Sequence, residues 1–229
     1  MGVQWSARSG RDSTTSAMFG VRVVCLSDTH NRHADIDVPD GDILIHAGDF
    51  TNHGNVEDVI SFNEWLGTLP HKVKIVVNGN HESNASWKKD IHELISNAKV
   101  LIDSSLAIDT PSGSSLIVYG TNFTWPMKEG RNPLYDQIPA NAAVIVSHGP
   151  AAGYVDGRLG CPTFTNRCEE LKHRSDSELK LVVSGHIHGA YGLERGSFMA
   201  GLKEVKFVNA AIAGGDIRGQ QRIPIVVDI

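Results

Sequence analysis

The sequence of 229 residues lacks several patterns that would assign it to common protein classes. It has no apolar run near the roughly 20 residues that span a bilayer, so we do not expect an integral membrane protein. Basic residues are not in excess, because 21 lysines and arginines against 26 acidic residues give a net charge of −5. This balance argues against non-specific nucleic-acid binding as the main activity.

Cysteine is also scarce. The three cysteines are Cys25, Cys161 and Cys168, which are too few and too scattered for a disulfide framework or for a Cys-x-x-Cys zinc site. We expect free thiols in a reducing compartment, with Cys161 and Cys168 in a loop.

Other signatures of hydrolases and kinases are missing as well. The H-E-x-x-H motif, the H-x-H-x-D-H cluster of metallo-β-lactamase-like enzymes and the P-loop glycine motif are absent. Residues 1–20 are rich in Ser, Thr, Arg and Gly and contain no apolar core of a secretory signal. We interpret them as a flexible tail, with a transit peptide as the alternative, and we predict a cytoplasmic protein.

The rest of the chain, residues 21–229, has the pattern of one α/β domain. Short β-branched runs followed by Gly, Asp, Asn or His predict buried strands within 21–30, 42–49, 72–82, 142–149 and 179–188. Apolar residues at helical spacing predict one helix after Asn55, extending to Leu69, and another over 86–98. Further strands are predicted at 115–120, 205–210 and 224–229, and the last two indicate antiparallel or mixed pairing in a second sheet.

Histidine is abundant, with 11 residues, and several follow the predicted strands together with carboxylate or amide side chains. The strand ends carry Asp28-Thr29-His30, Gly48-Asp49, Gly79-Asn80-His81-Glu82, His148-Gly149 and Gly185-His186-Ile187-His188. Ligands of α/β sheets bind beyond the carboxyl ends of strands, where such loops converge. Carboxylate, imidazole and amide donors suit Mn, Fe, Zn or Ni. Two neighbouring cations need a bridging carboxylate, for which Asp49 is the candidate.

These five segments, in this order, resemble the signature D-x-H, G-D, G-N-H-[DE], H and G-H-x-H of the calcineurin-like metallophosphoesterase superfamily. Further stretches resemble its MPPED-like branch: 27–32, 41–51, 62–70, 147–150, 185–192 and 207–210. The resemblance implies a β-sandwich of two mixed sheets flanked by helices.

The resemblance also implies a role for each site residue. One metal would be held by Asp28, His30, Asp49 and His188, and a second by Asp49, Asn80, His148 and His186. His81 would not bind metal but would approach the scissile phosphate oxygen, so that His81 and the bridging Asp49 are the catalytic candidates.

The implied cofactors are two divalent ions, with manganese favoured. The expected reaction is hydrolysis of phosphate esters by in-line attack of a metal-bridging hydroxide. Small phosphodiesters such as cyclic nucleotides are the expected substrates, and no stable nucleic-acid partner or membrane is expected. The alternatives are a phosphomonoesterase or protein phosphatase, and a non-catalytic metal-binding scaffold on the same fold.

Residues outside the signature have simpler interpretations. His46 either orients a ligand or is an ordinary strand histidine. We expect a structural role for Glu82 and a solvated Arg32, with phosphate binding as the alternative for Arg32. We expect Trp65 and Trp87 in the core. The remaining histidines are expected at the surface: His33, His53, His71, His92 and His173. Residues 122–127 lie where the MPPED-like branch has a longer aromatic loop, so the substrate specificity of that branch is not carried over to this chain.

Overall fold

Strand β1 (Arg22–Leu26) shows how the sequence builds the layers of the fold. Side chains alternate between the two faces of a strand. Val23 and Cys25 therefore point to one hydrophobic cluster, and Val24 and Leu26 point to another. The computed structural model describes residues 20–110, 112–196, 204–215 and 222–229, so the predicted tail lies outside the described residues except for Gly20.

The first sheet has the strand order β11-β1-β2-β3-β4. Its strands β1 to β4 are parallel, and only β11 runs antiparallel, against β1. The remaining members are β2 (Ile43–His46), β3 (Val73–Val76), β4 (Lys99–Val100) and β11 (Ile225–Asp228). The predicted strand at 224–229 therefore exists but belongs to the first sheet, which corrects its placement in the second.

The second sheet has the strand order β5-β6-β7-β8-β10-β9, with antiparallel edge strands β5 and β9. Its members are β5 (Ser104–Asp109), β6 (Ser115–Gly120), β7 (Val144–Val146), β8 (Leu181–Ser184), β9 (Gly192–Gly196) and β10 (Val205–Asn209). The predicted strands at 115–120 and 205–210 are β6 and β10. The expected α/β sandwich of two mixed sheets is confirmed.

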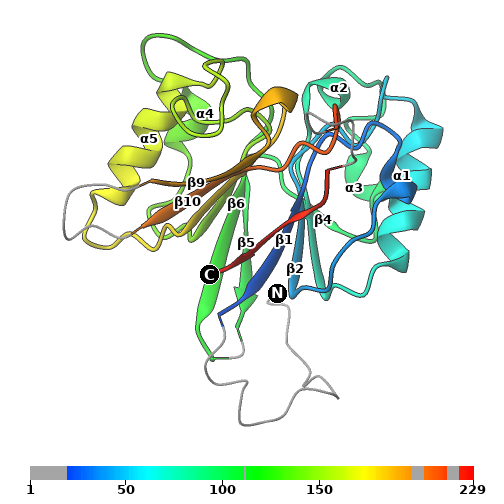
Figure 1. Ribbon diagram of the computed structural model, residues 1–229, viewed down its shortest axis with the longest axis horizontal. Helices are drawn as coiled ribbons and strands as arrows, with labels where there is room; N and C mark the ends of the chain where they lie inside the picture. Colours follow the sequence, from blue (N-terminus) through cyan, green and yellow to red (C-terminus); the bar gives the residue numbers. More distant parts are fainter. Residues whose placement is uncertain (1–19, 111, 197–203, 216–221) are drawn as a thin grey trace.

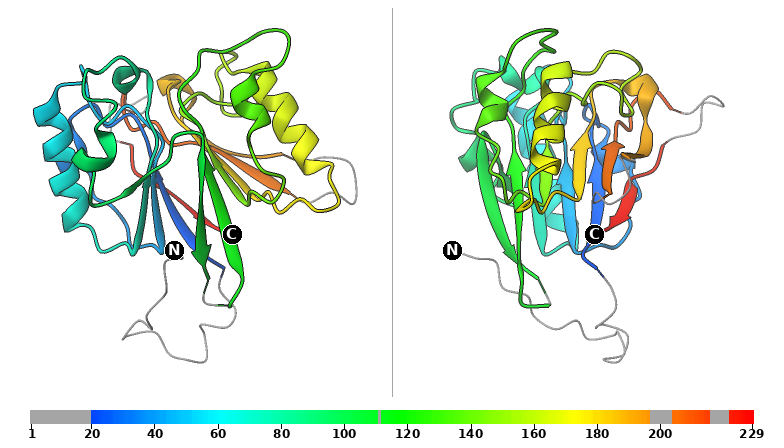
Figure 2. Two further views of the ribbon diagram at one scale, coloured as in Figure 1. Left: turned by 180° about the vertical axis from the view of Figure 1, so that it is seen from behind. Right: turned by 90° about the vertical axis from the view of Figure 1, so that its left-hand side faces the viewer.

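The two sheets pack face to face, and helices cover their outer faces (Figure 1). Between the sheets lies a core of small and β-branched side chains that includes Ile45, Val146 and Val183. Figure 2 shows α1, α2 and α3 beside the first sheet, and α4 and α5 beside the second. The helices are α1 (Val56–Thr68), α2 (Asn80–Ser83), α3 (Ile91–Leu94), α4 (Pro133–Asp136) and α5 (Pro162–Lys172).

The first predicted helix is confirmed as α1, but the second is much shorter than predicted. Residues 86–89 form turns and residue 90 a bend, so within 86–98 only α3 is helical. In these turns the Asp90 N–H donates to the Trp87 carbonyl, three residues back, at 2.8 Å. The apolar side chains of Trp87, Ile91 and Ile95 are still buried against the first sheet. Helical spacing thus predicted the buried face correctly and the backbone wrongly.

Helix α5 corrects the interpretation of the cysteine segment as a loop. Cys161 is the residue that precedes the helix, and Cys168 lies inside it. Both thiols are buried, and all three cysteines are free, as expected. Within the described residues, none of the helices has the length and apolar character needed to cross a bilayer.

Candidate metal centre

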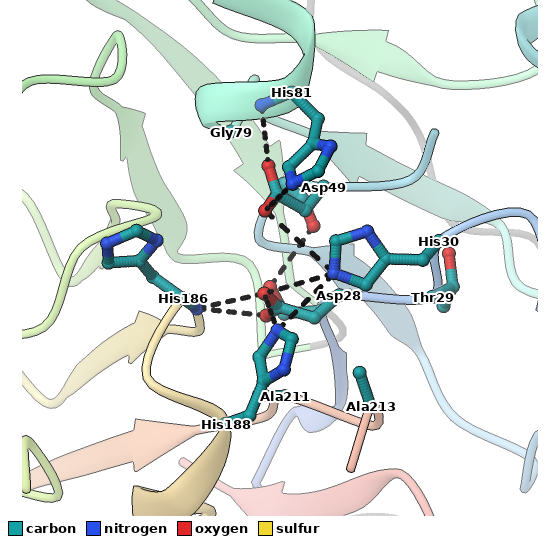
Figure 3. Close-up of polar contacts among 12 residues, drawn as sticks. Asp28, Thr29, His30, Asp49, Gly79, His81, His186, His188, Ala211 and Ala213 are labelled. Atoms are coloured by element: carbon teal, nitrogen blue, oxygen red, sulfur yellow. Dashed lines mark hydrogen bonds and ion pairs between the residues drawn. The ribbon is translucent and has the colours of Figure 1, made fainter. Parts of the chain in front are cut away.

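The predicted ligand residues lie at the carboxyl ends of parallel strands from both sheets, where the chain turns sharply. Asp28, Asp49 and His186 have φ values of 56°, 54° and 65°. This left-handed region is uncommon for residues with a side chain, and such conformations concentrate at functional sites. Figure 3 shows the carboxylates of Asp28 and Asp49 close to the rings of His30, His81 and His188, with the backbone nitrogen of His186 directed at Asp28.

Two glycines of the motifs are required by close contacts in this cluster. A Cβ atom at Gly79 would overlap the Asp49 carboxylate, and a Cβ atom at Gly185 would overlap that of Asp28. The glycines in G-N-H and G-H-x-H therefore allow neighbouring loops to approach the two carboxylates.

One side of the cluster consists of Asp28, His30 and His188. The Nε2 atom of His188 is 3.1 Å from Oδ1 of Asp28 and 3.3 Å from Nε2 of His30. The backbone N–H of His186 donates to Oδ2 of Asp28 at 2.9 Å. Because Asp28 follows β1 and His186 follows β8, this hydrogen bond also joins the two sheets.

The other side contains Asp49, Asn80, His148 and His186. The Nε2 atom of His148 is 3.2 Å from Oδ2 of Asp49 and 3.1 Å from Oδ1 of Asn80. The rings of His148 and His186 have centroids 5.1 Å apart. Asp49 lies between the two sides, since its Oδ2 is also 4.0 Å from Nε2 of His30.

Backbone carbonyls orient the histidines of the cluster. Nδ1 of His148 is 2.7 Å from the Ala47 carbonyl oxygen, and Nδ1 of His30 is 3.3 Å from that of Thr51. A carbonyl oxygen only accepts, so in each ring Nδ1–H donates and the neutral ring keeps the lone pair of Nε2 free. Nε2 is then the atom available to a metal, which is the usual arrangement of ligating histidines.

His81 faces the cluster from a more exposed position. Its Nδ1 donates to the Asn52 carbonyl oxygen, and its Nε2 lies 3.7 Å from Oδ2 of Asp49. The side chain is 32% exposed, compared with 3% for that of Asp49. His81 is therefore placed where it can contact a molecule that enters from solvent.

Glu82 holds the loops that carry these residues. Its buried carboxylate accepts hydrogen bonds from the backbone N–H groups of Asp49, Thr51 and Gly79 at 2.8–2.9 Å. It also accepts the Thr51 hydroxyl at 2.8 Å. The structural role predicted for Glu82 agrees with these contacts.

The charge distribution of the cluster suits cations. Burial would raise the pKa of Asp28, but the charge of His148 and the hydrogen bond from His188 outweigh burial and keep that pKa below its ordinary value. Burial likewise opposes ionisation of Asp49, and the hydrogen bond from His148 keeps its pKa low. Among the described residues, the ion pairs of both carboxylates are all with histidines.

Two ionised carboxylates this close repel each other unless cations lie between them. Three groups of donors could hold an ion, each with its ligand atoms within 4.8 Å of one another. They are Asp28, His30 and His188; His30, Asp49 and His81; and Asp49, His148 and His186. The residues therefore fit divalent metal ions, with oxygen and nitrogen donors of the kind that first-row metals prefer.

The structure brings all seven predicted ligands and His81 together, while their individual roles stay predictions. His46 is buried beside the cluster and hydrogen-bonds the Thr29 hydroxyl through Nε2 at 3.1 Å.

His33 and His71, expected at the surface, are both buried, which corrects those two predictions. His33 contacts the Ser61 hydroxyl at 3.3 Å, and His71 contacts the Pro39 carbonyl at 3.0 Å.

Some of the other residues lie as expected. Trp87 is buried, Trp65 is partly buried against the same core, and Arg32 is exposed and paired with Asp35. The exposed histidines are His53, His92 and His173. Sequence reasoning missed the carbonyls of Ala47, Thr51 and Asn52, because a backbone group that orients a side chain has no signal in residue type.

The chain is similar to a known protein family and to several known proteins. The family profile described as calcineurin-like phosphoesterase matches residues 21–190. The metallophosphoesterase domain-containing protein 1 of Homo sapiens is 30% identical over 91% of this chain and 71% of its own length. A UPF0046 protein of Caenorhabditis elegans is 33% identical over 91% of this chain and 81% of its own length.

Two other matches show less, because one covers a small part of the matched protein and the other has a low sequence identity. The probable rhamnogalacturonate lyase C of Emericella nidulans is 36% identical over 80% of this chain, which spans only 18% of that protein. The crystal structure of TT1561 of Thermus thermophilus has a TM-score of 0.58, with 91% of this chain and 99% of that chain covered. At 11% identity it shows a shared fold.

Proposed function

The chain belongs to the calcineurin-like phosphoesterase family, and from this membership we propose that it is a metal-dependent phosphodiesterase acting on small phosphate esters such as cyclic nucleotides. We further propose that it binds two divalent ions, with manganese favoured, and that it acts in the cytoplasm. The preference for diesters rests on the likeness to the MPPED-like branch.

The observation that carries the proposal is the position of Asp49 between two groups of histidines. Its carboxylate belongs both to the group with His30 and His81 and to the group with His148 and His186. A single carboxylate shared by two sets of donors is what a pair of neighbouring cations requires. Asp28, His30, His188 and Asp49 would hold one ion, and Asp49, Asn80, His148 and His186 the other.

When bound, two divalent ions supply a water of lowered pKa and neutralise charge on the phosphate. The protein's own residues fix the side chains that would hold these ions. The Ala47 and Thr51 carbonyls fix the ring orientations of His148 and His30, and the Glu82 carboxylate fixes the loop of Asp49. Because these groups are already fixed in position, the protein needs less rearrangement to reach the transition state.

His81 is suited to the leaving oxygen. With Nδ1–H donating to the Asn52 carbonyl, the neutral ring has Nε2 as an acceptor, and the protonated ring has Nε2–H as a donor. A protonated His81 could therefore donate its Nε2 proton to the oxygen that leaves phosphorus, as a general acid does.

The test is a turnover assay with metal-reconstituted protein and a chelated control. A bis-aryl phosphodiester is compared with an aryl phosphomonoester, and cyclic nucleotides follow. We expect metal-dependent turnover that favours the diester. A preference for the monoester would instead indicate a phosphatase. Absent or chelator-insensitive turnover on every ester would overturn the proposal and favour the scaffold.

A further inference from the structure

A pair of aromatic side chains stands beside the metal centre in the segment that follows β6. Trp125 is 64% exposed, although it is the largest side chain of this segment, whereas Trp87 is only 5% exposed. A tryptophan that buries so little of its ring gains little from folding. An exposed aromatic group at the edge of a polar site therefore suggests contact with a ligand.

The aromatic pair contacts the two histidines expected to hold the second metal. The Phe123 ring has its centroid 5.6 Å from those of both His148 and His186. The Trp125 ring lies 5.0 Å from Phe123 at 81°, and 5.8 Å from His186 at 70°. Phe123 thus contacts both histidines and Trp125, and the exposed Trp125, which also contacts His186, extends this surface toward solvent.

The segment is held in place although it has no regular secondary structure. The backbone N–H of Asn122 donates to the Asp103 carboxylate at 2.9 Å, and the Asn132 amide donates to the Thr124 hydroxyl at 3.2 Å. Pro126 follows Trp125 directly and restricts the backbone of the residue before it. A segment whose backbone is fixed in this way loses little conformational freedom when it binds a ligand.

We propose that Trp125 is a stacking platform for an aromatic group carried by the phosphate ester, either a nucleobase or an aryl group. The phosphate would lie at the metal centre, and its aromatic substituent would rest on the indole ring that Phe123 supports. Aromatic rings stack on tryptophan with little dependence on their identity, so both kinds of substituent are accommodated. This inference rests on the proposed function, since it names the substrate class for the same site.

The test measures binding rather than turnover. Isothermal titration calorimetry gives the Kd values of methyl phosphate, phenyl phosphate and adenosine 5′-monophosphate for the metal-loaded protein. The wild type should bind the two aromatic ligands about tenfold more tightly than methyl phosphate. Trp125→Ala should reduce that advantage to about twofold or less, while Trp125→Phe should keep most of it.

The matched control is Ile60→Ala, which removes an apolar side chain that is 45% exposed on α1. It should leave all three Kd values unchanged. Loss of the advantage for both aromatic ligands supports a general aromatic platform, and loss for the nucleotide alone supports a nucleobase platform. An unchanged ratio in Trp125→Ala, or no binding of any of the phosphates to the wild type, overturns the inference.

The two proposals fail in different ways. If Trp125→Ala loses the aromatic preference but no ester is hydrolysed, the binding platform stands and the phosphoesterase proposal fails. If diesters are hydrolysed and the Kd ratio in Trp125→Ala equals that of the wild type, the phosphoesterase stands and the platform fails.

Discussion

The imidazole of His148 and the carboxylate of Asp49 meet across the two sheets, with Nε2 of the histidine 3.2 Å from Oδ2 of the aspartate. His148 follows β7 of the second sheet, and Asp49 follows β2 of the first. The contact forms only when both sheets have packed against each other. The candidate metal centre is therefore a product of the tertiary fold and not of a local motif.

Substitution of the shared carboxylate tests this arrangement directly. Asp49→Asn should lower the metal content and reduce turnover at least about 100-fold, because the amide is a poorer bridge between two cations. Metal analysis after dialysis and a turnover assay measure both effects. Two tightly held ions in the variant would contradict the bridging assignment.

His81→Ala should separate metal binding from catalysis. We expect an unchanged metal content and a decrease in kcat of about 10²- to 10⁴-fold, which is the range of general acid catalysis. His53→Ala is the matched control, because His53 is exposed in the loop after Asp49. Unchanged turnover in His81→Ala, with the metals retained, would refute the catalytic role of His81.

The buried carboxylate of Glu82 should be a stabilising anchor. Glu82→Gln places an amide where the structure has donors on several sides, from Asp49, Thr51 and Gly79. We expect a loss of roughly 1–3 kcal/mol in the free energy of unfolding, since a buried donor is left without an acceptor. Urea unfolding measures it, with the exposed Glu93→Gln as control. Equal stability of the two variants would show that the Glu82 charge is dispensable.

His46 should make the metal-free protein less stable in acid. Burial lowers its pKa in the folded state to about 3, from an ordinary value near 6.5. Between these values only the unfolded state takes up the proton, so the free energy of unfolding falls as pH decreases below about 6.5. This group contributes a slope of up to about 1.4 kcal/mol per pH unit.

His46→Gln removes that titration and should make the pH dependence shallower by this amount between pH 6 and 5. Urea unfolding of the chelated protein at several pH values measures the slope. His92→Gln, at an exposed position, is the control and should follow the wild type. Parallel curves for the wild type and His46→Gln would mean that His46 is not kept neutral by burial.

Protons should compete with metal ions at His148. Burial would lower the pKa of His148, but the charges of Asp28 and Asp49 raise it to about 9 in the metal-free protein. A ligating imidazole must be neutral, so metal binding releases this proton near neutral pH. The Kd for Mn²⁺ should therefore decrease by up to about tenfold for each unit by which the pH is raised between pH 6 and 8. Competition with a metal-sensitive dye measures it, and a constant Kd would contradict this prediction.

Residue patterns predicted those parts of the fold that depend on local sequence. Apolar runs before turn residues located the strands, and the i, i+2 pairs after two of them pointed to a cluster of donors, whereas the full ligand set came from the resemblance to a known family. The sheet to which β11 belongs depends on pairing with β1, about 200 residues away, and no local pattern reports it. The burial of His33 and His71 depends likewise on distant partners, namely Ser61 and Pro39.

Helix α5 is a different case, because its signal was present in the sequence. Pro162 occupies the first turn, and Phe164, Cys168 and Leu171 follow at helical spacing and are buried. This spacing predicts a helix, so placing the two cysteines in a loop was wrong. The residues of the cluster could be predicted because metal ligands are restricted to few residue types and follow a family signature, whereas the backbone carbonyls that orient them have no such signal.

The pairing of the first and last described strands has a practical consequence. Val21 and Ile229 exchange two backbone hydrogen bonds, of 2.9 and 3.0 Å, at the end of β1 remote from Asp28. Figure 1 shows Ile229 at the lower side of the molecule and α2, which carries His81, at the upper side. A domain fused through either of these two positions would therefore be joined at the end of the first sheet that lies away from the candidate metal centre, and the fusion should leave the candidate site accessible.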